Sequence, residues 1–172
     1  MNAQTASKLV IVLFVVGLVS ACSSSGTLTV TQPKSQGIPP GKTASLSVEP
    51  GAAELRPIHQ EVATRVRDRL FGKLVSEGIF KAVVRVPEPA DYSMDVKVRG
   101  ARQVSTAARM WLGAMAGPNT LSLAVHVQDL KTNRLVTEFD VTGTSAAHPF
   151  SSEAGLDDAV REAVDRIAQA LR

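Results

Sequence analysis

Residues 120–141, TLSLAVHVQDLKTNRLVTEFDV, alternate apolar and polar side chains in two runs separated by a polar connection. This period of two is typical of β-strands with one buried face, and the connection from Asp129 to Arg134 predicts a hairpin. The side chains expected on its buried face are Leu121, Leu123, Val125, Val127, Leu135, Thr137, Phe139 and Val141. A hairpin with one apolar face needs a second layer to cover that face.

Two amphipathic helices are predicted to supply that layer. From Pro57 to Glu77 apolar residues recur every three or four positions, and Gly78 follows where a helix commonly ends. The same spacing recurs near the end of the sequence, from Ser152 onward. The two stripes are Ile58, Val62, Val66, Leu70 and Leu74, and then Leu156, Ala159, Val160, Ala163, Val164, Ile167 and Leu171.

Three further strands are predicted, at 43–48, 80–86 and 91–98, from period-two alternation or short runs of β-branched residues. The fold class that follows is α+β, a two-layer sandwich in the order β-α-β-β-β-β-α. Its mostly antiparallel sheet of four to five strands is covered on one face by the two helices. Residues 43–172 are expected to form this one domain.

The sequence before this domain has the layout of an export signal. Lys8 precedes the apolar run Leu9 to Val19, which is shorter than the roughly 20 residues that a membrane-spanning helix needs. Residues 1–21 are therefore predicted to be a cleaved signal peptide. Residues 22–42 are rich in Ser, Thr, Pro and Gly and poor in large apolar residues, which predicts a lipidated N-terminus followed by a flexible linker. A short strand at Leu28 to Thr31 is an alternative that the pattern does not support.

Val19, Ser20, Ala21 and Cys22 resemble the lipobox of bacterial lipoproteins, which is an aliphatic residue, two small residues and Cys. The resemblance implies that Cys22 begins the mature protein and carries a diacylglycerol thioether and an acyl chain such as palmitate. The two or three chains would hold the protein stably on a membrane. Ser23 is not the Asp that retains lipoproteins in the inner membrane, which favours the periplasmic face of the outer membrane. The alternative is a free thiol behind an ordinary secretory signal.

Composition excludes several classes of function. The 172 residues include one Cys, 19 Lys and Arg and 16 Asp and Glu, so a disulfide within the chain, a multi-cysteine zinc site and a nucleic-acid partner are not expected. His59, His126 and His148 lie far apart without metal-ligand spacing, and His59 and His126 fall on predicted polar faces. Asp91 and Asp95 would stand about 13 Å apart on one strand, beyond the separation used in glycoside hydrolysis. No catalytic residue, metal or cofactor is predicted.

Residues 106–117, TAARMWLGAMAG, contain the only Trp and carry only one charged residue, Arg109. One interpretation is a buried connection that plugs the end of the sheet. The other is an exposed apolar segment that touches a protein partner or lipid. The residues predicted to make such a contact are Arg109, Met110, Trp111, Leu112 and Met115.

Several of these features together resemble the bacterial lipoprotein family named domain of unknown function 4410. They are Gly78-Ile79-Phe80 with Val83, the strand after Asp91, residues 109–117 (RMWLGAMAG), the hairpin from Val127 to Asn133 and the closing helix. The resemblance covers Thr43 to Arg172, with Asn133 where a hairpin glycine is expected. It implies an envelope lipoprotein that faces the periplasm, and it implies no catalytic residue.

The predicted function is that of an acylated cell-envelope lipoprotein with a noncatalytic interaction or assembly domain. Its partners would be the membrane, through Cys22, and an envelope protein, through the segment 106–117. The alternative is a transport-associated lipoprotein that carries a lipid or small apolar ligand between the sheet and the helices.

Overall fold

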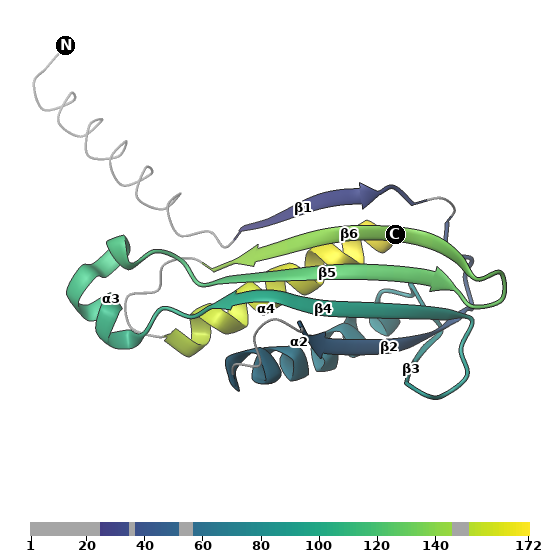
Figure 1. Ribbon diagram of the computed structural model, residues 1–172, viewed down its shortest axis with the longest axis horizontal. Coiled ribbons are helices and arrows are strands. Elements are labelled where there is room, and N and C mark those ends of the chain that lie inside the picture. Colours follow the sequence, from purple (N-terminus) through teal and green to yellow (C-terminus); the bar gives the residue numbers. More distant parts are fainter. Residues whose placement is uncertain (1–24, 35–36, 52–56, 146–151) are drawn as a thin grey trace, which may run out of the picture.

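A six-stranded sheet forms one layer of the protein in the computed structural model, which describes residues 25–34, 37–51, 57–145 and 152–172 (Figure 1). The spatial order of the strands is β1-β6-β5-β4-β2-β3. Their bounds are Ser25–Gln32 for β1, Thr43–Pro50 for β2, Ala82–Arg85 for β3, Tyr92–Arg102 for β4, Thr120–Asp129 for β5 and Arg134–Thr144 for β6. The strand β1 therefore forms one edge of the sheet and β3 forms the other.

The sheet is antiparallel on one side and parallel on the other. The strands β1, β6, β5 and β4 pair antiparallel in that order, whereas β2 pairs parallel with both β4 and β3. Parallel neighbours need a crossover connection, which the helix after β2 provides. The α+β class, the hairpin of β5 and β6, and the strands predicted at 43–48, 80–86 and 91–98 are confirmed. The sheet has six strands and not the predicted four to five, because β1 extends it.

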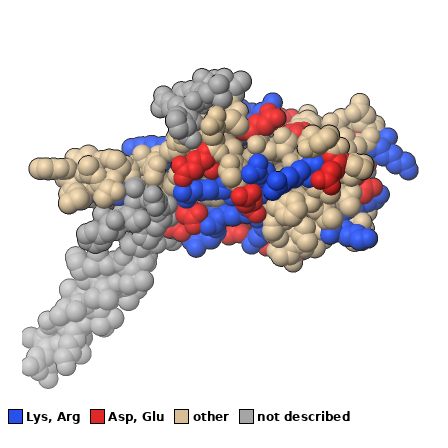
Figure 2. Space-filling view, turned by 90° about the horizontal axis from the view of Figure 1, so that it is seen from below, with Lys and Arg blue, Asp and Glu red and all other residues tan. Residues whose placement is uncertain are grey.

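Two long helices cover one face of this sheet, as predicted. The helix α2 spans Pro57–Ser76 and lies against β2, β3 and β4, while α4 spans Ser152–Leu171 and lies against β1, β5 and β6 (Figure 1). Ion pairs join them: Lys73 Nζ lies 2.7 Å from Asp165 and Arg172 lies 2.8 Å from Glu77. The pairs follow the same order along both helices, so α2 and α4 run in the same direction. Acidic and basic side chains are interleaved on the face seen in Figure 2.

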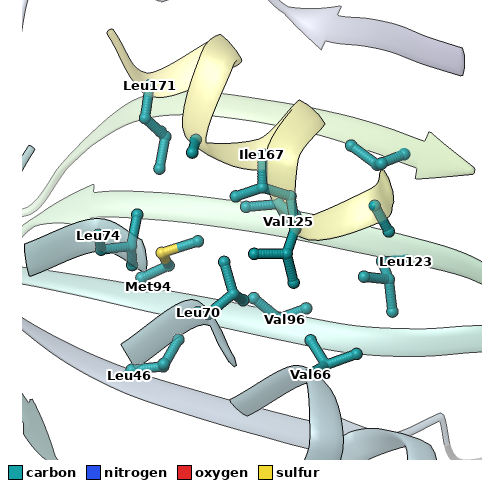
Figure 3. Packing of buried hydrophobic residues seen from close by; sticks show 14 of the residues in the cluster. Leu46, Val66, Leu70, Leu74, Met94, Val96, Leu123, Val125, Ile167 and Leu171 are labelled. Atoms are coloured by element: carbon teal, nitrogen blue, oxygen red, sulfur yellow. The ribbon is translucent and has the colours of Figure 1, made fainter. Parts of the chain in front are cut away.

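The core fills the space between sheet and helices. Side chains from both layers point toward one another there, as Leu70, Met94, Val125 and Ile167 illustrate (Figure 3). None of these four side chains is accessible to solvent. Burying an aliphatic side chain of this size contributes about 1.5–3 kcal/mol, so this cluster is the main source of stability.

No helix in the described ranges has both the length and the apolar character needed to cross a membrane.

The strand β1 corrects the prediction of a flexible linker over residues 22–42. Residues 25–32 pair antiparallel with β6, with Thr27 opposite Thr142 and Leu28 opposite Val141. The residues of β1 are largely exposed, so backbone hydrogen bonds to β6, and not burial of apolar side chains, specify the strand. The spacing of apolar residues therefore indicates at most the short strand at Leu28 to Thr31. Residues 22–24 and 35–36 of the predicted linker lie outside the described residues.

The hairpin turn contains Asn133 in the left-handed region, with φ of 55°. Asn is the residue other than Gly that most readily adopts this conformation. Its side-chain oxygen also accepts a hydrogen bond of 2.6 Å from Gln128 Nε2. Asn133 therefore occupies the expected glycine position without changing the hairpin.

Candidate functional site

The segment predicted as a candidate contact is a short helical projection beyond the sheet. The helix α3 spans Thr106–Leu112 and continues into a 3₁₀ turn, η2, over Gly113–Ala116. Ser105 caps α3 because its hydroxyl accepts a hydrogen bond of 3.2 Å from the amide of Ala108. Gly113 ends the helix at φ of 55°, which suits a residue without Cβ. We call residues 106–116 the α3 projection.

The α3 projection exposes most of its large side chains. The exposed fractions are 77% for Met110, 88% for Trp111, 56% for Leu112 and 88% for Met115. Figure 2 shows this end of the molecule as an uncharged extension, at the left, of a body rich in charge. Of the two interpretations of residues 106–117, the structure therefore supports the exposed segment and not the buried plug. Apolar groups that gather in this way mark contact surfaces.

Arg109 differs from the other predicted contact residues. It is only 2% exposed, and its Nη2 donates a hydrogen bond of 3.1 Å to the side-chain oxygen of Asn119. Helical spacing explains this position, because Arg109 lies on the side of α3 opposite to Trp111. The prediction that Arg109 forms part of the contact surface is therefore wrong. Arg109 instead belongs to the base that holds the projection on the sheet.

Asn119 is the centre of this base and was not predicted from the sequence. It is fully buried, and its side-chain oxygen accepts a second hydrogen bond, of 2.7 Å, from the amide of Val104. Its own amide donates to Ser145 Oγ at 3.2 Å, and the amide of Ser145 donates back to its carbonyl at 3.0 Å. The network ties both ends of the projection to the end of β6. The signal in the sequence that could have pointed to Asn119 is the turn-forming stretch Gly-Pro-Asn-Thr at positions 117–120.

The projection lies at the end of the sheet where the N-terminal strand begins. Ser25, the first residue of β1, is opposite Thr144 of β6, which is also opposite Thr120 of β5. These three residues form one row across the sheet, and the α3 projection precedes Thr120 by four residues. Cys22 and the predicted lipobox residues Val19, Ser20 and Ala21 lie outside the described residues.

The remaining candidate residues are not brought together. His59 is buried at 4% exposure, contrary to its prediction on a polar face, because it lies on the side of α2 that faces the core. His126 is on the uncovered face of the sheet, with Nδ1 4.0 Å from Glu138. Within the described ranges, no group of three or more His, Cys, Asp or Glu side chains could hold a metal ion.

The uncovered sheet face contains an open hollow of about 480 Å³. Charged side chains of both signs line it together with His126: Glu49, Asp95, Lys97, Arg99 and Glu138. Arg99 also lies 3.5 Å from Asp140. Since the charges are mixed, the hollow selects neither anions nor cations, and it resembles the wet face of an antiparallel sheet.

Asp91 has a structural role at the opposite end of the sheet from α3. Its carboxylate accepts hydrogen bonds from Lys42 Nζ at 2.8 Å and from the amide of Thr43 at 2.9 Å. These two interactions lower the pKa of Asp91 from 3.8 to about 2. Asp91 also raises the pKa of Lys42 through the same ion pair. The carboxylate thereby joins the start of β2 to the start of β4.

Replacing Asp91 should change the acid dependence of stability. A carboxyl group whose pKa is lower in the folded state stabilises the fold above its ordinary pKa. That stabilisation is lost as pH falls from the ordinary value of 3.8 to about 2. Asp91→Asn is expected to be less stable than the wild type at neutral pH and to lose less stability across that acid range. Urea unfolding at a series of pH values measures both effects.

The Lys42→Met variant provides the companion measurement. The hydrogen bonds from Thr43 remain in this variant, so its acid dependence should lie between those of the wild type and Asp91→Asn. Identical slopes for the wild type and Asp91→Asn would contradict the assignment.

The family model described as "Domain of unknown function (DUF4410)" matches residues 26–149. Among solved structures, the PelC dodecamer from Paraburkholderia phytofirmans is 17% identical with a TM-score of 0.55, covering 85% of this chain and 96% of that chain. A single-substitution variant of that PelC gives 18% identity and a TM-score of 0.56 with the same coverage.

Protein XCC0632 from Xanthomonas campestris is 13% identical, with a TM-score of 0.49 over 86% of this chain and 90% of that chain. No curated protein sequence matches the chain. The similarity to PelC shows a shared fold.

Proposed function

The chain belongs to the DUF4410 family, and from this premise we propose that it is a lipid-anchored protein of the cell envelope with a noncatalytic assembly domain. The anchor is Cys22, whose lipobox residues are described above. The domain associates side by side with further copies of the same chain. It faces the periplasm from the outer membrane. The structurally similar PelC is a dodecamer, which supports the proposal of assembly among copies.

The observation that carries this proposal is a pair of different apolar surfaces on opposite flanks. On β1, Leu28 is 39% exposed and Val30 is 50% exposed. Leu28 pairs with buried Val141 and Val30 pairs with buried Phe139, so both lie on the side of the sheet that the helices cover. They extend the apolar core to an open edge.

The second flank is formed by α2. Phe71 is 40% exposed and Val75 is 39% exposed. Lys73 faces α4, and a side chain two positions along a helix points about 200° away, so Phe71 and Val75 face away from α4. A shallow hollow of about 140 Å³ beside Phe71 reaches Arg85 at the edge strand β3.

Two different surfaces on opposite flanks favour a head-to-tail contact. In such a contact the β1 flank of one copy meets the α2 flank of the next, and repetition produces a ring or a filament. A two-fold symmetric dimer would instead use one flank twice. The strand order places β1 and β3 on opposite edges of the sheet. The β1 flank and the flank beside β3 are therefore two separate surfaces.

Disulfide crosslinking in the cell envelope tests the head-to-tail contact. A full-length chain with both Val30→Cys and Phe71→Cys should give a ladder of multimers after oxidation, while a mixture of the two single variants should stop at dimers. An acylated Cys22 does not compete, because its sulfur is in a thioether. The matched control combines Val30→Cys with Leu130→Cys, since Leu130 is 46% exposed but lies on the β5–β6 hairpin. Monomers only, or dimers from Val30→Cys alone, would contradict the proposal.

Mass spectrometry of the mature N-terminus tests the anchor separately. The expected N-terminal peptide begins at Cys22 and carries the mass of diacylglycerol and an acyl chain. An unmodified Cys22, or cleavage at another residue, would overturn the lipoprotein assignment.

The alternative function, a carrier of a lipid or small apolar ligand, requires space between the sheet and the helices. Leu70, Met94, Val125 and Ile167 occupy this space and are inaccessible to solvent (Figure 3). Interiors packed in this way do not accept a ligand without displacing side chains. The core therefore favours assembly over carriage.

A further inference from the structure

We propose that the α3 projection inserts into the lipid bilayer beside the acylated N-terminus and forms a second membrane contact. This inference rests on the lipid anchor proposed above. The occupant of the apolar surface is thus the interfacial region of the membrane, where acyl chains meet headgroups. The contact would orient the domain, with the long direction of its strands rising from the membrane.

The first argument is position. Ser25 lies in one row with Thr144 and Thr120, at the end of the sheet that carries the α3 projection (Figure 1). Cys22 is three residues before Ser25, and three consecutive Cα–Cα steps extend at most about 11 Å. Because β1 is part of the sheet, no long linker separates the domain from its anchor. The end of the domain that bears α3 must therefore lie close to the bilayer.

The second argument is the chemistry of the projection. Trp111 and Met115 are both 88% exposed, and Met110 is 77% exposed. The only charged residue between positions 103 and 118, Arg109, is buried in the base. An uncharged surface with a tryptophan suits the membrane interface, where its apolar ring and polar N–H are both accommodated.

The third argument is that the projection is held outward. Arg109 and Val104 both donate to the side-chain oxygen of Asn119. Arg102 also donates a hydrogen bond of 3.2 Å to the carbonyl of Ala116 at the end of η2. With its polar side fixed to the sheet, α3 cannot turn Trp111 inward. The apolar side chains are thus presented in one direction.

Membrane insertion and side-by-side assembly use different surfaces. The flanks that carry Val30 and Phe71 are lateral edges of the molecule, whereas α3 is at the end. Copies that associate through their flanks can therefore all direct α3 to the same bilayer. A protein partner at α3 would have to occupy the narrow space beside the anchor, which makes lipid the favoured occupant.

The single tryptophan makes this inference directly measurable. Full-length acylated protein is reconstituted into vesicles of phosphatidylethanolamine and phosphatidylglycerol. Trp111 emission should shift to shorter wavelength relative to the protein in solution. Lipids brominated near the headgroup end of the acyl chain should remove most of its intensity, and lipids brominated near the terminal methyl should remove less. This order follows from insertion of only about 5–10 Å.

The control moves the tryptophan to the other end of the sheet. In the double variant Trp111→Phe with Leu130→Trp, the probe lies beyond β5, about 30 Å away. Its emission should show neither the shift nor the quenching, although the anchor is the same.

The outcomes separate the two proposals. Protein that carries no acyl chains and does not float with the vesicles would show that the anchor itself is absent. Acylated, floating protein whose Trp111 emission is unshifted and unquenched would overturn the α3 inference alone. A shift without quenching by brominated lipid would also overturn it, because another protein copy would then cover Trp111. Crosslinking from position 115 to a protein in cells would do the same.

Discussion

Gly143→Val is expected to unfold a large part of the protein. Gly143 lies on β6 where α4 crosses the sheet, and a Cβ atom there would collide with the carbonyl oxygen of Ala159 and the amide of Ala163. Both are backbone atoms, so the collision can be relieved only by moving the helix away from the core. We expect the free energy of unfolding to fall by more than about 4 kcal/mol, which is typical of a major disruption of packing. Domains of this kind are typically stable by only about 5–15 kcal/mol.

Urea unfolding followed by circular dichroism measures this loss. Gly100→Val on β4 is the matched control, because a Cβ at Gly100 meets no atom within 4 Å. The control should change the free energy of unfolding by less than about 0.5 kcal/mol. Equal effects of the two substitutions would show that strand propensity, and not helix contact, determines the result.

Asn119→Ala is expected to cost about 3 kcal/mol and to loosen the α3 projection. The substitution leaves the amide of Val104 and the guanidinium of Arg109 without their shared acceptor in a buried position. Gly155 of α4 also packs closely against the Asn119 side chain, so the variant creates a cavity between α4 and the projection. The fluorescence anisotropy of Trp111 should fall together with the free energy of unfolding.

Ser105→Ala is the matched control for this prediction. It removes only the cap of α3, through the hydrogen bond to Ala108, and should cost about 1 kcal/mol. If Asn119→Ala cost no more than Ser105→Ala, the buried network would not be the support of the projection.

The presence of β1 changes the expected relation between the domain and the membrane. A flexible linker of some twenty residues would hold a domain on the order of 25 Å from its anchor. With residues 25–32 in the sheet, only Ser23 and Ser24 lie between Cys22 and the fold. If Cys22 carries the proposed lipid anchor, the domain is therefore held close to the membrane surface, and assembly would take place beside the bilayer.

The fold was predictable where periodicity is strong. The predicted helix from Pro57 to Glu77 matches α2 within one residue, and the predicted strand from Thr120 to Gln128 matches β5 equally well. Both elements have one buried face, so the spacing of their apolar residues predicts both the element and the side that is buried. The helix α3 was missed, and β1 was indicated only as an unsupported short strand at Leu28 to Thr31, because neither element buries an apolar face of its own.

The candidate site was only partly predictable for the same reason. Composition singled out residues 106–117, but apolar side chains would be equally suited to a buried plug or to a projection. The role of Asn119 depends on Val104, Arg109 and Ser145, which come from three different parts of the chain.

Ion pairs between helices were also not predictable from local spacing. The four-residue spacing of Asp157 and Arg161 predicts a pair within one helix, but the Asp157 carboxylate instead lies 2.5 Å from Arg69 of α2.

By itself, the sequence determined the α+β class, the two helices and the central strands, and it predicted the lipobox at Cys22. These depend on neighbouring residues, because the periods of helices and strands and a short motif are local. Only the tertiary structure decided that β1 joins the sheet, that Arg109 is buried while Trp111 is exposed, and that the α3 projection lies at the end of the sheet where β1 begins. Each depends on which distant segments meet: pairing with β6 makes β1 a strand, and Asn119 fixes which side of α3 faces water.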